Sequence, residues 1–415
     1  MESEEVLAVI GAGQAGAELA VQAREAGWRG RVVLVGDEPA LPYHRPPLSK
    51  AYLAGAASLD SLALKARATY DWAGVELMLN RKVVSVDRSR RRIYFEKRAA
   101  LPYTRLAFAT GGRPRPLPAA ALGADTAHNF HYLRTLADVD RIRSGFVAGA
   151  RLAIIGGGYI GLEVAAVAIK SGLQVVVLET APRVLARVTA PAISSFYEAI
   201  HREAGVDLRT GVQVECFELD RERNRVTAIS CRDGARIECD LVIAGIGLIP
   251  NTELAAACGL AVDDGIVVDA HSRTSDADIV AAGDCTRFHS PLYGRSIRLE
   301  SVPNSLEQAR CAAATLNGKE RLHDTVPWFW SDQYDFKLKM VGLSQGHDRL
   351  VLRGSIEQRS FSAFYLKGNR VLAVDTVNRV PEFMWAKRLV GEQVAVDADR
   401  LADDGVPLKS LLPNP

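Results

Sequence analysis

The sequence contains no C-x-x-C pair, although six cysteines occur among its 415 residues. Zinc sites, iron–sulfur clusters and redox-active dithiols are often built from cysteines spaced this closely, so we expect none of these centres and no metal. The cysteines are predicted to be reduced, partly buried thiols, as is usual in the cytoplasm. They are Cys216, Cys231, Cys239, Cys258, Cys285 and Cys311.

Long apolar runs and a strong net charge are also absent. No apolar run approaches the roughly 18 residues that identify a membrane-spanning helix. The first residues, Met-Glu-Ser-Glu-Glu, are too acidic for a signal peptide. The net charge of +2 gives no overall signal for nucleic acid. We therefore expect a cytoplasmic monomer that binds neither membranes nor nucleic acid.

One segment, 151–179, carries the clearest pattern: RLAIIGGGYIGLEVAAVAIKSGLQVVVLE. An apolar run enters a G-x-G-x-x-G turn (Gly156, Gly158, Gly161), a helix-like stretch follows, and a β-branched run ends in Glu179. Such glycines permit a tight turn, admit a pyrophosphate and let helix and strand pack, while the helix start presents free N–H groups. Glycines spaced in this way can mark only a turn, but the complete β-α-β unit favours a dinucleotide site.

The acid at the end of this unit indicates which dinucleotide binds. A carboxylate at Glu179 would accept hydrogen bonds from the adenosine ribose and repel a 2′-phosphate, which favours NADH over NADPH. Arg183 lies close enough in sequence to weaken this preference.

A second unit of the same kind occupies the N-terminal region, from Val6 to Glu38. It contains Gly11, Gly13 and Gly16 and ends at Asp37. Two such units imply two nucleotides on one chain, most simply a tightly held FAD at the first unit and an exchangeable NADH at the second.

Two further strand ends mark the domain organisation. Residues 105–112 bring a strand to a turn at Thr110, and residues 279–284 end a strand in Gly-Asp, where Asp284 could accept a hydrogen bond from the FAD ribityl chain or simply form a turn. Residues 240–247 weakly repeat the strand-to-glycine ending of 105–112, and prolines follow both, so we expect the chain to cross between domains at these two places. The predicted domains are FAD-binding (1–113 and 247–326), NADH-binding (114–246) and C-terminal (327–415). The predicted class is α/β, with two Rossmann-like domains and a C-terminal α+β domain.

Nine motifs together resemble the FAD-dependent ferredoxin reductases of oxygenase systems over nearly the whole chain. They are GAGQAG at 11–16, LPYHRPPLSK at 41–50, ATGGRPR at 109–115, GGGYIGLE at 156–163, AGIGLIPN at 244–251, GDC at 283–285, ESVPN at 300–304, FWSDQY at 329–334 and LAVDTVNRVP at 372–381. The resemblance implies a glutathione-reductase-like plan. It also implies FAD contacts at Ala15, Asp37, Lys50, Val83, Arg134, Asp284 and Val302.

The resemblance changes the interpretation of Lys50, while two aromatic residues keep two interpretations each. The proline-fixed loop before Lys50 could leave that lysine solvated, but the resemblance implies that it lies beside the flavin ring and pairs with Glu163. Tyr159 is either a movable cover over the ring or a helix-packing residue. Trp330 is either a core residue or an exit for electrons at the flavin edge.

The resemblance also implies the reaction and the partner. NADH would give hydride to the flavin, and single electrons would pass to a [2Fe-2S] ferredoxin that serves a haem-thiolate monooxygenase. The alternative partner system is a Rieske aromatic-ring dioxygenase, because His44-Arg45-Pro46 carries an arginine found in those reductases. Candidate docking residues are Arg310, Lys387, Arg388 and Lys409.

Three other classes of protein share the two-nucleotide plan. A coenzyme A disulfide reductase needs a cysteine in the loop that here reads Leu48-Ser49-Lys50, and a glutathione-reductase-type enzyme needs a dithiol there. A flavin-bearing interaction protein like apoptosis-inducing factor would need a strongly basic face, which the net charge of +2 does not suggest.

Overall fold

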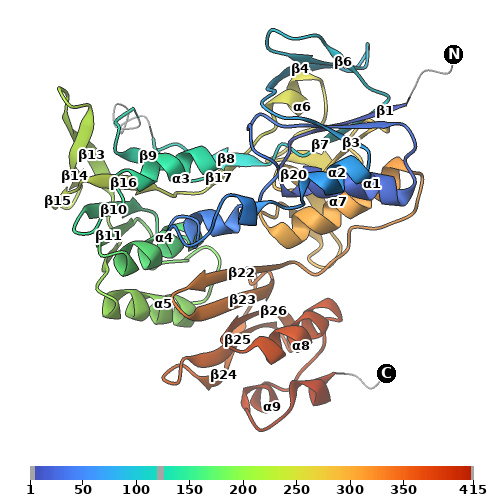
Figure 1. Cartoon of the computed structure of the whole chain (residues 1–415). Helices are drawn as coiled ribbons and strands as arrows, with labels where there is room; N and C mark the ends of the chain where they lie inside the picture. Colours follow the sequence, from blue (N-terminus) through green and yellow to red (C-terminus); the bar gives the residue numbers. More distant parts are fainter. Residues whose placement is uncertain (1–4, 119–125, 413–415) are drawn as a thin grey trace. The chain divides into compact units, whose positions relative to one another are not determined.

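The computed structural model describes residues 5–118 and 126–412, coloured along the chain in Figure 1. The chain divides into two compact units. Unit 1 consists of Met1–His44, Leu59–Arg113 and Ile249–Pro327, and unit 2 of Arg45–Ser58, Pro114–Leu248 and Trp328–Pro415. The bounds of the three predicted domains stay a prediction, and the loop that carries Lys50 lies in unit 2.

Unit 1 is built on a five-stranded parallel sheet with the order β19-β7-β1-β2-β3. Its strands are β1 (Val6–Ile10), β2 (Arg31–Val35), β3 (Val75–Met78), β7 (Arg105–Phe108) and β19 (Ile279–Ala281). All five residues of β1 are buried, as expected for a parallel strand covered on both faces. Helices α1 (Gln14–Ala26) and α7 (Val302–Leu316) pack against each other beside this sheet (Figure 1).

Smaller elements complete unit 1. They are the three-stranded sheet β4 (Val83–Asp87), β5 (Arg92–Phe95) and β6 (Leu101–Pro102), the sheet β18 (Ile266–Val268), β20 (Thr286–Ser290) and β21 (Arg295–Ile297), and the helices η2 (Asp60–Leu62), α2 (Arg67–Trp72) and α6 (Glu253–Ala257). The chain passes between the units along β8 (Gly112–Pro114) and β17 (Leu248–Pro250).

Unit 2 contains a second five-stranded parallel sheet, with the order β12-β11-β10-β16-β9. Its strands are β9 (Phe130–Tyr132), β10 (Arg151–Ile155), β11 (Gln174–Glu179), β12 (Asp207–Thr210) and β16 (Leu241–Ala244). Around it lie η1 (Pro46–Ser49), α3 (Leu136–Arg143), α4 (Tyr159–Lys170), α5 (Pro191–Glu203) and an antiparallel sheet of β13 (Val214–Asp220), β14 (Arg225–Cys231) and β15 (Arg236–Glu238).

The C-terminal part of unit 2 is an antiparallel sheet with the order β22-β23-β26-β25-β24. The elements are β22 (Trp328–Gln333), β23 (Phe336–Gly342), β24 (Arg349–Ser355), β25 (Ser360–Lys367), β26 (Arg370–Val377), α8 (Val380–Gly391), α9 (Ala398–Ala402) and η4 (Leu408–Leu411). The predicted class, two Rossmann-like α/β units with a C-terminal α+β region, is therefore confirmed.

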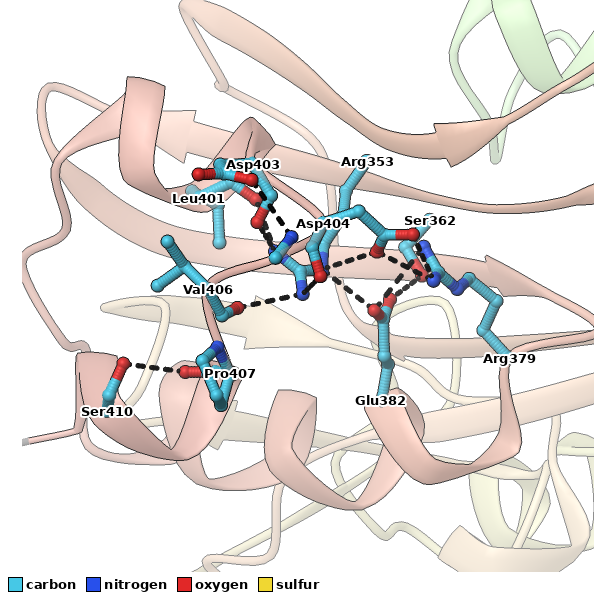
Figure 2. A network of polar contacts seen from close by, with 11 residues as sticks. Arg353, Ser362, Arg379, Glu382, Leu401, Asp403, Asp404, Val406, Pro407 and Ser410 are labelled. Atoms are coloured by element: carbon cyan, nitrogen blue, oxygen red, sulfur yellow. Dashed lines mark hydrogen bonds and ion pairs between the residues drawn. The ribbon is translucent and has the colours of Figure 1, made fainter.

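A buried arginine ties the segment of residues 401–406 to this sheet (Figure 2). Arg353, on β24, is only 4% exposed and donates to the Glu382 carboxylate at 2.8 Å. Its guanidinium also donates to the backbone carbonyls of four residues: Leu401, Asp403, Asp404 and Val406. Because a buried guanidinium needs partners for its five donors, these carbonyls hold the segment after α9 in one path.

Neither a membrane-crossing helix nor a cluster of metal ligands occurs among the described residues. Within 5–118 and 126–412, no helix combines the length and apolarity needed to cross a membrane. In the same ranges, no group of three or more His, Cys, Asp or Glu side chains is arranged to hold a metal ion.

Candidate nucleotide and redox site

The first glycine turn, between β1 and α1 in unit 1, leaves room for a phosphate. A Cβ atom on Gly11 would lie 2.1 Å from the Ala109 carbonyl oxygen, and one on Gly16 would lie 1.8 Å from the Gly11 carbonyl oxygen. A Cβ on Gly13 would meet no atom within 4 Å. No side chain caps α1 at Gly13, so its first N–H groups are open to an anion. These residues fit a bound pyrophosphate.

The second turn, between β10 and α4 in unit 2, repeats this geometry. A Cβ on Gly156 would lie 2.5 Å from the Gly245 carbonyl oxygen, and one on Gly161 would lie 2.2 Å from the Gly156 carbonyl oxygen. Gly158 again faces open space and caps α4 with no side chain. Each unit therefore has its own cradle of the same design for a dinucleotide.

The acid of the second turn is anchored by backbone groups. Glu179 accepts hydrogen bonds from the Gly157 N–H at 2.6 Å and the Ala181 N–H at 2.7 Å. Arg183, predicted to weaken the preference for NADH, instead donates to the hydroxyl of Ser194 at 2.6 Å and to a backbone carbonyl of its own loop. Its guanidinium is therefore engaged away from the acid.

The other predicted FAD contacts of unit 1 differ in their burial and in the element that carries them. Asp37 is exposed just after β2, whereas Val83 is buried at the start of β4 and Val302 begins α7. Thr110 donates to the Asn251 carbonyl oxygen at 2.6 Å, which ties the end of β7 to the returning chain.

Gly283, the residue before Asp284, lies close to Ala15. Asp284 follows Gly283, where a Cβ would lie 3.0 Å from the Cβ of Ala15. The Gly-Asp segment after β19 therefore lies against the first glycine turn. Their roles as FAD contacts stay a prediction, as does that of half-buried Arg134 in unit 2.

In unit 2 the structure brings together Lys50 and Glu163. The Lys50 ammonium lies 2.6 Å from Oε2 of Glu163, with 21% of the Lys50 side chain and 5% of the Glu163 side chain exposed. The hydroxyl of Ser49 donates to the same oxygen at 2.5 Å, and the hydroxyl of Ser331 donates to Oε1 at 2.6 Å. The carboxylate thus receives an ammonium and two hydroxyl donors, which together fix its orientation.

Sequence reasoning missed both serines. Ser331 and Gln333 alternate with exposed Asp332 along β22, so both polar side chains are on the buried face of the strand. Polar residues at every second position of a buried strand face need partners, and this spacing was the available signal.

Aromatic side chains surround the start of α4. The Tyr159 hydroxyl donates to the sulfur of Met340 at 2.7 Å, and its ring lies 5.0 Å from that of Phe329. Burial raises the pKa of Tyr159 well above its usual value, so the hydroxyl keeps its proton. The half-buried ring of Trp330 lies 5.7 Å from that of Trp328. These contacts hold Tyr159 in place, and its role as a cover stays a prediction.

Three of the predicted docking residues lie in the C-terminal part of unit 2. The ammonium of Lys387 lies 4.3 Å from the ring centre of Trp328, and burial lowers its pKa. Arg388 pairs with Glu392 at 2.9 Å, and Lys409 is exposed. The fourth, Arg310 in unit 1, is held by Glu18 and Glu307, each at 2.9 Å.

Comparison with known proteins places these features in one family. The family model described as "pyridine nucleotide-disulphide oxidoreductase" matches residues 6–314, and the model "reductase C-terminal" matches residues 328–412. The chain is 54% identical to putidaredoxin reductase of Pseudomonas putida over 412 residues, covering 99% of this chain and 98% of that protein.

Another relative is named as part of a dioxygenase system. The ferredoxin–NAD(+) reductase component of the anthranilate 1,2-dioxygenase system of Burkholderia cepacia is 36% identical over 415 residues, with 99% of this chain and all of that protein covered. Among solved structures, the covalent complex of putidaredoxin reductase with putidaredoxin matches with a TM-score of 0.95 at 54% identity, covering 98% of each chain.

Proposed function

Because the chain belongs to the pyridine nucleotide-disulphide oxidoreductase family, we propose that it is an NADH:ferredoxin oxidoreductase that delivers electrons to a [2Fe-2S] ferredoxin. The predictions of an oxidoreductase and of FAD with a nicotinamide dinucleotide are confirmed by this membership and by the named ferredoxin reductases among the relatives. The terminal enzyme in this proposal is a haem-thiolate monooxygenase.

The observation that carries the proposal is the Lys50–Glu163 pair, combined with two uncapped glycine turns. The turn of unit 1 would hold the FAD pyrophosphate and the turn of unit 2 that of NADH. A disulfide reductase would need a cysteine at the site of the pair, and here the neighbouring residue is Ser49. The electrons must therefore leave to an external acceptor.

FAD supplies the redox chemistry, taking a hydride and giving up electrons singly, while the protein positions and stabilises. The anchored Glu179 would orient the adenosine ribose of NADH. Lys50 would place a positive charge where negative charge develops on the flavin, and Glu163 would keep that ammonium in position. Holding donor and acceptor groups in a near-attack arrangement is the enzyme's main contribution to the rate.

The preference for NADH has its own structural support. Glu179 presents negative charge beside the second turn, and the nearby Arg183 is bound to Ser194 and so is not directed at a 2′-phosphate. We propose that NADPH is a poor substrate for this reason.

A Rieske dioxygenase system is the second candidate, because relatives of both kinds cover nearly the whole chain. Arg45, the residue that suggested the dioxygenase reductases, donates to the carbonyl oxygen of Arg134 at 2.5 Å and so fixes the loop. The higher identity to the monooxygenase-type reductase favours the first candidate. A cytoplasmic location is part of the proposal, supported by six cysteines that are all free thiols.

Anaerobic mixing tests the function directly. The yellow protein is mixed with NADH or NADPH in a stopped-flow instrument, and loss of flavin absorbance is followed. Oxidised [2Fe-2S] ferredoxins from monooxygenase and dioxygenase systems are then added. We expect rapid bleaching by NADH and fastest electron transfer to a monooxygenase-type ferredoxin. A colourless protein, or a flavin that NADH does not reduce, would contradict the proposal.

A further inference from the structure

A continuous hydrogen-bond network of buried polar side chains begins at Glu163, and the proposed function does not use it. Ser331, Gln333 and His201 are each at most 1% exposed. The Ser331 hydroxyl donates to Glu163 at 2.6 Å, Gln333 Nε2 donates to Ser331 at 3.2 Å, and His201 Nε2 lies 2.9 Å from Gln333 Oε1. Tyr334 is the last member of this hydrogen-bond network, with its hydroxyl 3.1 Å from His201 Nδ1.

The partners decide the direction of every hydrogen bond. Because Oε1 of Gln333 can only accept, His201 must carry its proton on Nε2 and donate it. When the imidazole is neutral, His201 Nδ1 accepts from the hydroxyl of Tyr334. Burial lowers the pKa of His201, which agrees with a neutral ring. All donors in the hydrogen-bond network therefore point toward Glu163, and each bond polarises the next.

The hydrogen-bond network connects three separate elements of unit 2. Glu163 is on α4, Ser331 and Gln333 are on β22, and His201 is on α5. Burying three uncharged polar side chains costs free energy unless each is satisfied, and an apolar core would hold these elements together at least as well. The hydrogen bonds of these three side chains lead to Oε1 of Glu163, and the other oxygen of the same carboxylate faces Lys50.

We propose that Ser331, Gln333 and His201 are positioning residues that hold the Glu163 carboxylate turned toward Lys50. The inference rests on the proposed function, because the Lys50 ammonium is the charge that would stabilise reduced flavin. In this view Ser331 acts through Glu163, and Glu163 acts through Lys50. Loss of the Ser331 donor leaves the ammonium less firmly held, which makes the bound flavin harder to reduce.

The test uses the FAD-loaded full chain and two readouts. The first is the midpoint potential of the bound flavin, titrated against reference dyes; the second is the stopped-flow rate of its reduction by NADH. For Ser331→Ala we expect a lower potential and a rate about tenfold lower, the loss expected for one hydrogen bond to a charged group. Ser331→Thr, which keeps the hydroxyl, should restore most of both.

A double-mutant cycle separates positioning from simple packing. In a Glu163→Gln background, Ser331→Ala should change the potential and the rate by less than about twofold. Gln333→Met, which keeps the length of the side chain but removes its amide, should shift the potential in the same direction by a smaller amount. Thermal unfolding of each variant confirms that the fold is kept, and Gln333→Met serves where Ser331→Ala is unstable.

The outcomes are distinct from failure of the proposed function. If wild-type protein binds FAD and is reduced by NADH, but Ser331→Ala keeps the wild-type potential, or its effect is undiminished in the Glu163→Gln background, the inference is overturned. If the wild-type flavin is not reduced by NADH, the proposed function itself fails.

Discussion

The two glycine-turn helices carry a buried glutamate at the same position, two residues after the third glycine, yet the two carboxylates have different partners. Glu18 on α1 faces two cations, with Arg310 at 2.9 Å and Lys65 at 3.3 Å. Glu163 on α4 faces one ammonium, that of Lys50, and the hydroxyls of two serines. The same sequence position therefore supports a structural ion pair in one unit and a poised charge in the other.

The difference shows how a repeated unit can acquire a function. Arg310 lies on α7 and Glu18 on α1, so their ion pair joins two neighbouring helices of unit 1. Around Glu163 the neutral donors leave Lys50 as the sole cation paired with this carboxylate among the described residues. The Lys50–Glu163 pair carries no net charge, so what unit 2 can offer a cofactor is the position of one ammonium, whereas the two cations at Glu18 are engaged in the fold.

The largest expected effect concerns a third buried carboxylate, Glu382, which is held mainly by an arginine. Replacing Arg353 with Met leaves the carbonyls of residues 401–406 without their donor and removes a buried partner of Glu382. We expect a loss of about 3 to 5 kcal/mol in the free energy of unfolding, the range for breaking a buried pair. Denaturant unfolding would measure it.

The control for this change lies on the same strand. Arg349 is 58% exposed at its side chain and lies 4.0 Å from Asp399. Arg349→Met should change stability by less than about 0.5 kcal/mol. Equal losses in both variants would show that burial does not set the strength of the pair.

Replacing Glu18 or Glu163 with glutamine tests the comparison itself. Glu163→Gln should slow reduction of the flavin by NADH on the order of 100-fold while FAD stays bound, because Lys50 loses its anchoring charge. Glu18→Gln should leave this rate within about twofold. It should instead lower stability by about 1 to 2 kcal/mol, since Lys65 and Arg310 keep access to solvent. Similar kinetic losses in both variants would remove the functional distinction.

Asp375 extends the comparison to a buried carboxylate that lacks an ion pair among the described residues. Burial raises its pKa to about 7, although Tyr365 donates a hydrogen bond to it. The unfolded chain ionises this group from about pH 4, whereas the folded chain keeps the proton up to about pH 7. Because the unfolded state binds fewer protons in this window, stability falls as pH rises from about 4 to 7.

Asp375→Asn removes this titration and keeps an acceptor for Tyr365. Between pH 5 and pH 7 we expect the variant to gain about 2 kcal/mol relative to the wild type. Thermal unfolding at several pH values would show it. Parallel stability curves for the two proteins would mean that Asp375 is ionised in the fold.

The smallest expected effect concerns Arg183, which lies close in sequence to Glu179, the acid that ends the second β-α-β unit. Ser194→Ala would release Arg183, which could then reach a 2′-phosphate beside Glu179. We expect kcat/KM for NADPH to rise a few-fold with little change for NADH. Adding Arg183→Met should abolish the gain, and a gain that persists in this double variant would contradict the interpretation.

Short-range signals explain which parts of the site could be predicted. The glycine turns, the strands around them and the acid Glu179 follow from steric needs within about 30 residues of chain. The helix-like stretch predicted after the second turn is α4, which begins at Tyr159. The Lys50–Glu163 pair came only from resemblance to a family, since no local pattern links residues so far apart. Ser331, Gln333 and His201 were missed because their partners come from distant segments.

The amino-acid sequence alone determined the two dinucleotide cradles, since a turn that admits a phosphate needs glycine at particular positions whatever lies around it. It also determined the absence of a nearby dithiol. Only the tertiary structure decided that Glu163 receives Ser49, Lys50 and Ser331 while the equivalent Glu18 receives Arg310 and Lys65. The physical reason is that the state of a buried charge depends on the groups that packing brings against it, and these come from segments far away in the chain.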